Sequence, residues 1–462
     1  MVMINRNRLG QTFALLMLSS SLAVSGRVQA DPLQVIDSLP TDESLDALKA
    51  VAEQLPKRLV IALDGLAYDD VLKVQTTEKR CMQSFYPASR AVSTYPSLSD
   101  IAWADMLRVA PPAGYQRYYY STRRNQIIGG SLADMGNPQE YEHRMHLVFD
   151  KLSQHAKAYV ASFKMAKTEI RGITEKFFES RNTKNFYAYM LTTDTVGHTA
   201  GDMEGLICYL DENLQRMQAK YKAVTGRDLE IALMSDHGNN HANQGKLTNL
   251  KENLRDHGFE IGSHIVGPKD VAFTTGGILT SASVFMKPES LASVAEVAIQ
   301  STGVDLITYV DQNDASTVYV RKPNGDIARV IFDRASGRYG YAPVVGDPLS
   351  YLPVMEAMRA AGKLDEKGFA TDVDWVTYSS GHYYPVAPVR VYRGHHEITR
   401  NPAPLIVSLA DGWEITYGFV KAISRMHKRG GTHGALSAGG SNGVVITNYK
   451  PTQDVYTAQV SD

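Results

Sequence analysis

The 462-residue sequence contains only two cysteines, Cys81 and Cys208. Neither belongs to a Cys-x-x-Cys pair, which argues against a thiolate metal centre. In an oxidising compartment the two could form one disulfide, and as free thiols they would pack as small apolar side chains, so both states stay open. Any metal site in this chain is therefore expected to use histidine and carboxylate ligands.

An excess of charge of one sign is also missing. The chain has 48 Lys and Arg against 49 Asp and Glu, a net charge of -1, so no global field attracts nucleic acid or an anionic membrane. We therefore expect no nucleic-acid-binding surface. Internal repeats and low-complexity segments are absent, and 44% hydrophobic with 21% charged residues is ordinary for a globular protein.

Long apolar runs are missing beyond the N-terminus. There, a basic start at residues 5–8 precedes an apolar segment at 13–24 and the small-residue end Val28-Gln29-Ala30. This order predicts a signal peptide over residues 1–30, because the apolar segment is short for a membrane span and rich in serine. A membrane anchor is the alternative. We expect export, periplasmic or secreted, with the mature chain starting near Asp31 and no membrane span left after cleavage.

Several apolar segments that predict buried strands end in aspartate, histidine or glycine. Residues 58–63 run into Asp64-Gly65, residues 185–191 into Asp194 and His198, and residues 229–235 into Asp236-His237-Gly238. Near the C-terminus, Thr432-His433-Gly434 precedes a further predicted strand at residues 443–447. Functional groups of open α/β sheets lie past the carboxyl ends of the strands, so we expect these side chains to meet there. Turn formation or helix capping is the alternative for each of them taken alone.

A hydroxyl group joins this set at the start of a predicted helix. The sequence Ser99 to Leu107 is amphipathic, and Ser97 or Ser99 fits the N-cap position. Unpaired amides at a helix start favour an anionic substrate, while simple capping is the alternative.

The predicted strands and helices indicate an α/β fold with an insertion. A mostly parallel central sheet flanked by helices is expected for residues 31–259 and 401–462, with a strand at 404–409 that resumes this core. Between them, residues 260–400 contain short strands, helices near 291–300 and 352–361, and a hairpin signal at Pro323-Asn324-Gly325-Asp326. This region is expected to fold as an α+β cap.

Taken in order, these segments resemble the alkaline phosphatase superfamily, and most closely its type I phosphodiesterase/nucleotide pyrophosphatase branch. The order is Asp, Ser or Thr, Asp-xxx-His, Asp-His and a distant His, and it extends from Ile61 to Gly434. The resemblance implies an alkaline phosphatase-like fold and two divalent metal ions, with zinc expected. It implies that Asp194, His198 and His433 hold one ion, that Asp64, Asp236 and His237 hold the other, and that the nucleophile Ser99 also bridges towards the metals.

Six nitrogen and oxygen ligands are enough for two metal sites, which can clamp both oxygens of an in-line phosphoryl displacement. We therefore expect an exported two-metal hydrolase of small-molecule phosphate esters, diesters above all, with a phosphoseryl intermediate on Ser99. A phosphomonoesterase or a phosphonate hydrolase is the alternative within the same fold. A catalytically silent protein that binds metal or ligand is the alternative from another class. A formylglycine sulfatase is unexpected, because Cys81-Met82-Gln83-Ser84 lacks the proline and arginine of that motif.

Overall fold

The structure is a computed structural model of the chain. It describes residues 52–129, 138–149, 152–181, 184–199, 201–242, 245–274, 277–416 and 430–460. The predicted signal peptide, residues 1–30, and the predicted start of the mature chain at Asp31 lie outside these ranges. Residues from Ala52 to the C-terminus belong to one unit. Over the described ranges, no helix combines the length and apolar character that a bilayer crossing requires.

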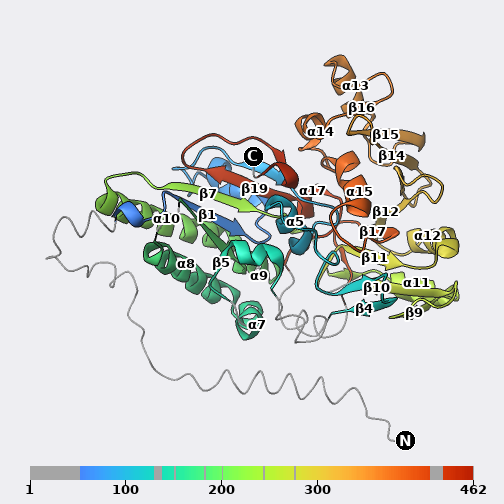
Figure 1. The fold of residues 1–462 in the computed structure, drawn as a ribbon, viewed down its shortest axis with the longest axis horizontal. Coiled ribbons are helices and arrows are strands. Elements are labelled where there is room, and N and C mark those ends of the chain that lie inside the picture. The colour runs from blue at the N-terminus through green and yellow to red at the C-terminus, as the bar shows by residue number, and fades with distance from the viewer. Residues whose placement is uncertain are drawn as a thin grey trace, which may run out of the picture. The chain divides into compact units, whose positions relative to one another are not determined.

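A seven-stranded sheet carries the strand ends that the sequence singles out (Figure 1). Its strands lie in the order β20 (Val455–Tyr456), β2 (Ser89–Val92), β19 (Asn442–Thr447), β7 (Glu230–Ser235), β1 (Arg58–Leu63), β6 (Asn185–Met190) and β5 (His146–Leu147). Strands β5, β6, β1 and β7 pair in parallel, whereas β19 is antiparallel to both of its neighbours. The sheet is therefore mostly parallel, as predicted.

Strand β1 lies at the centre of this sheet because both of its faces are apolar. Leu59, Ile61 and Leu63 belong to one hydrophobic cluster, and Val60 and Ala62 belong to another on the opposite face. This alternation follows from the two-residue period of a strand. Burial on both faces is what a parallel sheet covered by helices requires.

Helices cover the two faces. The first cluster receives apolar side chains of α4 (Tyr68–Leu72), α8 (Ser162–Glu179) and α10 (Met203–Thr225). On the other face, Trp103 and Met106 of α5 (Ser99–Met106) join Tyr141 of a 3₁₀ helix, Glu140–Arg144. Two further helices of this part of the chain are α7 (Leu152–Val160) and α9 (Thr192–His198), and a short π-helix, Lys73–Thr77, continues α4.

A nine-stranded sheet contains most of the second half of the chain. Its order is β16 (Phe369–Ala370), β15 (Arg338–Val345), β14 (Ile327–Asp333), β13 (Thr317–Arg321), β12 (Val304–Val310), β17 (Leu405–Leu409), β11 (Ser281–Phe285), β10 (Asp270–Thr274) and β9 (Glu260–Gly262). All neighbours are antiparallel except β9 and β10. The predicted hairpin at residues 323–326 connects β13 to β14.

Strand β17 differs from the sequence-based expectation. Residues 404–409 were expected to resume the first sheet, but β17 pairs with β11 and β12 in the middle of the second. An apolar segment of this length fits a buried strand of either sheet, and its partners are decided by the tertiary fold. The division into a core at 31–259 and 401–462 and a cap at 260–400 stays a prediction.

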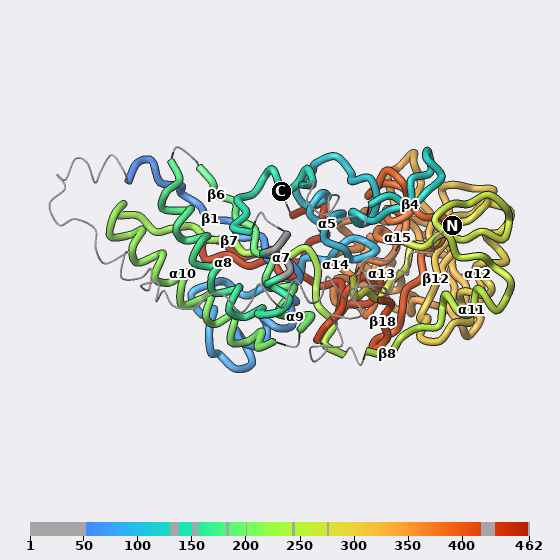
Figure 2. Tube along the Cα trace, turned by 90° about the horizontal axis from the view of Figure 1, so that it is seen from below, coloured from blue at the N-terminus to red at the C-terminus, as the bar shows by residue number. Residues whose placement is uncertain are grey.

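Helices also pack around the second sheet, and they are α11 (Leu250–Asp256), α12 (Leu291–Ile299), α13 (Leu352–Ala360), α14 (Asp372–Ser379) and α15 (Ala387–His396). Two strand pairs lie apart from the large sheets, β3 (Tyr119–Ser121) with β4 (Gln126–Ile128) and β8 (Lys246–Leu247) with β18 (Trp413–Glu414). The short helices are α17 (Ala438–Ser441), Pro288–Ser290 and Thr457–Gln459. Figure 2 shows β1, β6 and β7 with α8 and α10 at one end of the view, and β12 with α11 and α12 at the other.

Cys81 and Cys208 form a disulfide. It joins the segment after the π-helix to helix α10, across 127 residues of chain. Of the two states that the sequence left open for these cysteines, the structure therefore contains the bonded one.

Candidate active site

The parallel pairing of three strands brings their carboxyl ends to one edge of the first sheet. Leu63, the last residue of β1, is in register with Met190 of β6 and with Ser235 of β7. Asp64 follows β1 directly, and Asp236 follows β7 directly. Their carboxylates therefore lie at neighbouring positions of this edge, as expected for an open α/β sheet.

Helix α9 adds two side chains to the same edge. It begins two residues after β6, and Asp194 and His198 are four residues apart on it, so they lie on one helical face. The hydroxyl of Thr193 donates a hydrogen bond to the backbone oxygen of Asp64 at 2.5 Å. This bond ties the first turn of α9 to the end of β1.

His433 arrives from the segment that leads into α17 and β19. Its neighbour Thr432 forms an isolated β-bridge with Asn240, which lies four residues after Asp236. His433 itself forms an isolated β-bridge with Leu279. The segment is thus held between the end of β7 and the start of β11.

Ser99 is the first residue of α5, and the N-cap position belongs to Leu98. The prediction that the side chain of Ser97 or Ser99 caps this helix is wrong. The hydroxyl of Ser97 contacts the backbone oxygens of Thr94 and Ala435, and the hydroxyl of Ser99 points to the carboxylate site instead.

The structure gathers the six predicted ligand side chains into two groups of three. Within the described residues, one group consists of Asp194, His198 and His433, and the other of Asp64, Asp236 and His237; the ligand atoms of each group lie within 4.8 Å of one another. The rings of His237 and His433 stack with their centroids 3.9 Å apart. The two groups are therefore adjacent.

All three histidines are oriented by backbone oxygens. Nδ1 of His198 lies 2.9 Å from the oxygen of Gly431, Nδ1 of His237 lies 2.8 Å from that of Gly238, and Nδ1 of His433 lies 2.8 Å from that of Ser97. A carbonyl oxygen can only accept, so Nδ1 carries the proton in each ring. When such a ring is neutral, its Nε2 carries the lone pair, and this is the arrangement of metal-bound histidines.

The carboxylates fit a cation. Oδ1 of Asp194 and Oδ2 of Asp236 are buried without a hydrogen-bond donor, and among the described residues no lysine or arginine forms an ion pair with either of them or with Asp64. Buried carboxylates without a partner are costly. Oxygen and imidazole nitrogen are ligands that zinc accepts, so the donor set fits a pair of divalent cations.

The pKa values show the same concentration of charge. Burial raises the pKa of Asp64 well above its ordinary value, and the nearby charges of Asp236 and Asp194 add to this effect. Burial also raises the pKa of Asp236. For Asp194, burial acts in the same direction, but the nearby charge of His198 lowers its pKa overall. The site thus contains several buried carboxylates whose negative charges repel one another, so their joint ionisation requires a nearby positive charge.

Burial, followed by the charge of His237, lowers the pKa of His433 well below the ordinary value. His433 is therefore neutral at physiological pH. A neutral imidazole is the form that binds a metal ion.

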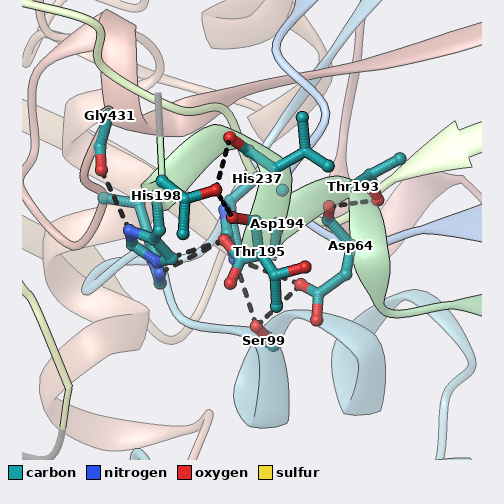
Figure 3. Close-up of polar contacts among 12 residues, drawn as sticks. Asp64, Ser99, Thr193, Asp194, Thr195, His198, His237 and Gly431 are labelled. Atoms are coloured by element: carbon teal, nitrogen blue, oxygen red, sulfur yellow. Dashed lines mark hydrogen bonds and ion pairs between the residues drawn. The ribbon is translucent and has the colours of Figure 1, made fainter. Parts of the chain in front are cut away.

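Ser99 lies beside the second group (Figure 3). Its Oγ is 3.1 Å from Oδ1 of Asp64 and 3.1 Å from Nε2 of His237. The side chains of Asp64, Asp194, His198 and His237 point toward the same small volume. The Ser99 hydroxyl thus contacts two side chains of the second group and remains partly exposed.

Gly65 makes the close approach of the two groups possible. It has a φ of 62°, and a Cβ atom there would lie 2.7 Å from Oδ1 of Asp194 and 3.0 Å from Cε1 of His237. Its amide donates to Oδ1 of Asp236 at 3.0 Å. Any side chain at this position would displace ligands of both groups.

Three residues around the site were missed by the sequence analysis. Tyr189 donates its hydroxyl to Asp64, Glu169 accepts from the first turn of α9, and Arg390 contacts the segment before Ser99. Two of them had a sequence signal. Glu169 lies on the apolar face of α8, with Ala166, Ile170 and Ile173, and Arg390 interrupts an apolar stretch. Tyr189 reads as an ordinary strand residue.

Comparison with known proteins places the chain in a family. A family model described as type I phosphodiesterase/nucleotide pyrophosphatase matches residues 67–436. A search of curated protein sequences gave no match. The chain belongs to the type I phosphodiesterase/nucleotide pyrophosphatase family.

Solved structures of ectonucleotide pyrophosphatases/phosphodiesterases are similar to this chain over most of its length. Human ectonucleotide pyrophosphatase/phosphodiesterase 5 is 13% identical, with a TM-score of 0.45, 87% of this chain and 92% of that chain covered. The murine protein is 10% identical, with a TM-score of 0.47 and the same coverages. A murine form described as inactive and in complex with AMP is 10% identical, with a TM-score of 0.45, 88% of this chain and 92% of that chain covered.

Family membership makes the protein a metal-dependent phosphoric ester hydrolase. The predicted α/β fold with a mostly parallel central sheet is confirmed. The predicted phosphodiester chemistry is confirmed at the level of the family. The individual ligand and nucleophile assignments stay predictions.

Proposed function

We propose that the protein is an exported phosphodiesterase for small molecules that binds two zinc ions and uses Ser99 as its nucleophile. The observation that carries this proposal is the arrangement of the two three-residue groups, with the Ser99 hydroxyl beside one of them. Asp194, His198 and His433 would hold one ion, and Asp64, Asp236, His237 and Ser99 would hold the other.

The Ser99 hydroxyl needs activation, because a free serine is a poor nucleophile at neutral pH. When bound, the two ions would lower the pKa of this hydroxyl and neutralise charge on the phosphate oxygens. Ser99 begins α5, an eight-residue helix, and the first amides of a helix have no partner within it. These amides provide donors for phosphate oxygens beside the nucleophile.

Ser99 Oγ would then form a bond to phosphorus while the bond to the leaving oxygen breaks. The departing alcohol takes up the proton that the serine loses, and the product on the enzyme is a phosphoseryl group that still carries the second alcohol of the diester. Attack of water on its phosphorus releases a phosphate monoester and restores the serine hydroxyl. Each displacement inverts phosphorus, so the full reaction retains its configuration.

Export is supported by two features of the chain. The N-terminal sequence has the order of a signal peptide, and the Cys81–Cys208 disulfide is of the kind that persists in oxidising compartments. Mass spectrometry of the N-terminus of protein isolated from the producing cells tests this part. A mature chain that starts near Asp31 is expected, and a full-length chain in the cytoplasm would contradict export.

Turnover of a matched pair of substrates tests the reaction. We expect kcat/KM to be higher for a nitrophenyl phosphodiester than for the corresponding monoester. Exhaustive chelation should abolish both activities, and zinc should restore them. A strong monoester preference would identify a phosphomonoesterase instead, and full activity after verified metal removal would contradict the metal-dependent mechanism.

A further inference from the structure

Tyr189, a residue of strand β6, contacts the site through its hydroxyl group. It is the last residue but one of β6, and its side chain is 6% exposed. Its hydroxyl donates to Oδ2 of Asp64 at 2.5 Å. A hydrogen bond from a hydroxyl to an ionised carboxylate is charge-assisted and stronger than one between neutral groups. One oxygen of Asp64 is therefore already engaged by the protein.

The other oxygen of Asp64 faces the ligand group. Oδ1 accepts from Ser99 Oγ at 3.1 Å and lies 3.6 Å from Nε2 of His237. The two oxygens thus have different surroundings, with Oδ1 directed to the histidine and the nucleophile and Oδ2 directed to the phenol.

Aromatic packing fixes the Tyr189 hydroxyl in place. The ring of Trp103, from α5, meets the Tyr189 ring edge to face with centroids 5.9 Å apart, and the ring of Tyr141 lies at 6.5 Å. Tyr141 in turn donates its hydroxyl to Oδ1 of Asp100, the residue after Ser99. Because the ring is confined between these neighbours, the hydroxyl cannot turn away from Asp64 without repacking the cluster.

We propose that Tyr189 is a positioning residue that restricts Asp64 to binding a divalent ion through Oδ1 alone. The proposal rests on the proposed function, in which Asp64, Asp236 and His237 hold one ion. A carboxylate can bind a metal ion through one oxygen or through both. Catalytic zinc sites need an open position for substrate, and a hydrogen bond to a ligand oxygen is a common way to orient that ligand. By occupying Oδ2, Tyr189 keeps this position free for a substrate oxygen.

Removal of one oxygen atom tests the proposal. Tyr189→Phe keeps the ring and its packing and releases Oδ2, so that both oxygens of Asp64 can turn to the ion. Tyr141→Phe is the matched control, because it removes a buried hydroxyl from the same aromatic cluster but one that contacts Asp100 instead of Asp64.

The measurement is the visible absorption of the protein loaded with two cobalt ions per chain. The intensity of these bands falls as the coordination number of cobalt rises. We expect weaker absorption per cobalt for Tyr189→Phe, at unchanged cobalt content, and an unchanged spectrum for Tyr141→Phe. The kcat/KM of Tyr189→Phe should fall about 10- to 100-fold.

Three results would overturn the proposal. A spectrum of Tyr189→Phe equal to that of the wild type, at full cobalt content, would show that the phenol does not limit Asp64 while leaving the proposed function intact. Loss of cobalt from Tyr189→Phe would show that the hydroxyl is needed to hold the ion at all. A wild type that takes up no cobalt or zinc would remove the proposed function itself, and this inference with it.

Discussion

The two large sheets of the molecule differ in how their strand ends meet. In the first sheet, β6, β1 and β7 are parallel, so their carboxyl ends share one edge, and that edge carries Asp64, Asp236 and His237. In the second sheet nearly all neighbours are antiparallel, so successive carboxyl ends lie at opposite edges. None of the seven predicted site residues directly follows a strand of the second sheet.

The difference shows that parallel pairing of strands, rather than the number of strands in a sheet, brings the candidate site residues together. The second sheet instead presents aromatic and aliphatic side chains to its helices, as in the cluster that contains Tyr351 and Trp375. Helix α15, which packs against the second sheet, contacts the segment before Ser99. The guanidinium of Arg390 is completely buried and donates to the oxygens of Thr94 and Leu436 and to the hydroxyls of Ser97 and Ser441. We therefore expect large losses from changes at the first sheet edge and smaller, indirect losses from the second region.

The largest loss is expected for Ser99→Ala, at the edge of the first sheet. Without the nucleophile, kcat should fall about 1000-fold or more, equivalent to roughly 4 kcal/mol of transition-state stabilisation. Steady-state kinetics on the diester measures this effect. Ser97→Ala is the control, since the hydroxyl of Ser97 bonds to backbone oxygens and to Arg390 and not to the ligand side chains, while its backbone oxygen is unchanged by the substitution. Near-normal turnover of Ser99→Ala would show that another group attacks phosphorus.

A smaller effect, on stability, is expected for Glu169→Gln behind the first sheet edge. Glu169 accepts from the amides of Leu191 and Thr192 and from the Thr192 hydroxyl, and burial raises its pKa from 4.5 to about 7. Between these pH values the folded chain keeps a proton that the unfolded chain has lost, so the contribution of Glu169 to stability decreases as pH rises.

We therefore compare the unfolding free energies of the wild type and of Glu169→Gln. The value for the wild type minus that for the variant should fall by about 3 kcal/mol from pH 4.5 to pH 7. Urea denaturation of both proteins across this range measures the difference. Glu175→Gln, on the exposed side of the same helix, is the control for the loss of a carboxylate from α8. A flat profile for Glu169→Gln would mean that the buried carboxylate is ionised throughout.

The smallest of the three effects is expected for Arg390→Met in the second region. Its donors hold the segment that ends at Ser99, and the backbone oxygen of Ser97 in that segment orients His433. Small displacements of reacting groups reduce rates strongly, so we expect kcat to fall about 10- to 100-fold, roughly 2 kcal/mol.

Arg393→Met is the matched control on the same helix, because Arg393 pairs with Asp105 of α5 and does not contact the segment before Ser99. It should lower the melting temperature with little change in kcat. Equal kcat losses in the two variants would mean that α15 acts on the site only through general stability.

The strands of the first sheet and its site residues could be predicted because each signal is local. Residues 58–63 and 185–190 are short apolar segments that run directly into Asp64 and, one turn further on, Asp194, so the sequence indicates both the strand and its chemistry. Parallel pairing then brings these ends together without further information. The four-residue spacing of Asp194 and His198 is likewise a local feature, and it places both side chains on one face of a helix.

The features that the sequence did not reveal depend on distant partners. The sheet to which β17 belongs is decided by pairing with β11 and β12, far along the chain. The role of Tyr189 depends on the carboxylate of Asp64, 125 residues away, and nothing in its own strand marks it. The N-cap prediction for Ser97 and Ser99 was wrong because Asp64, His237 and Arg390 provide these hydroxyls with other partners.

The metal content of the purified protein tests the central claim most directly. Inductively coupled plasma mass spectrometry of protein equilibrated with zinc and then freed of excess metal should give two zinc ions per chain. The same value is expected for Ser99→Ala, and a lower one for His433→Ala and for His237→Ala. A wild type that retains no metal, or variants of both histidines that still retain two ions, would contradict the assignment of the two ligand groups.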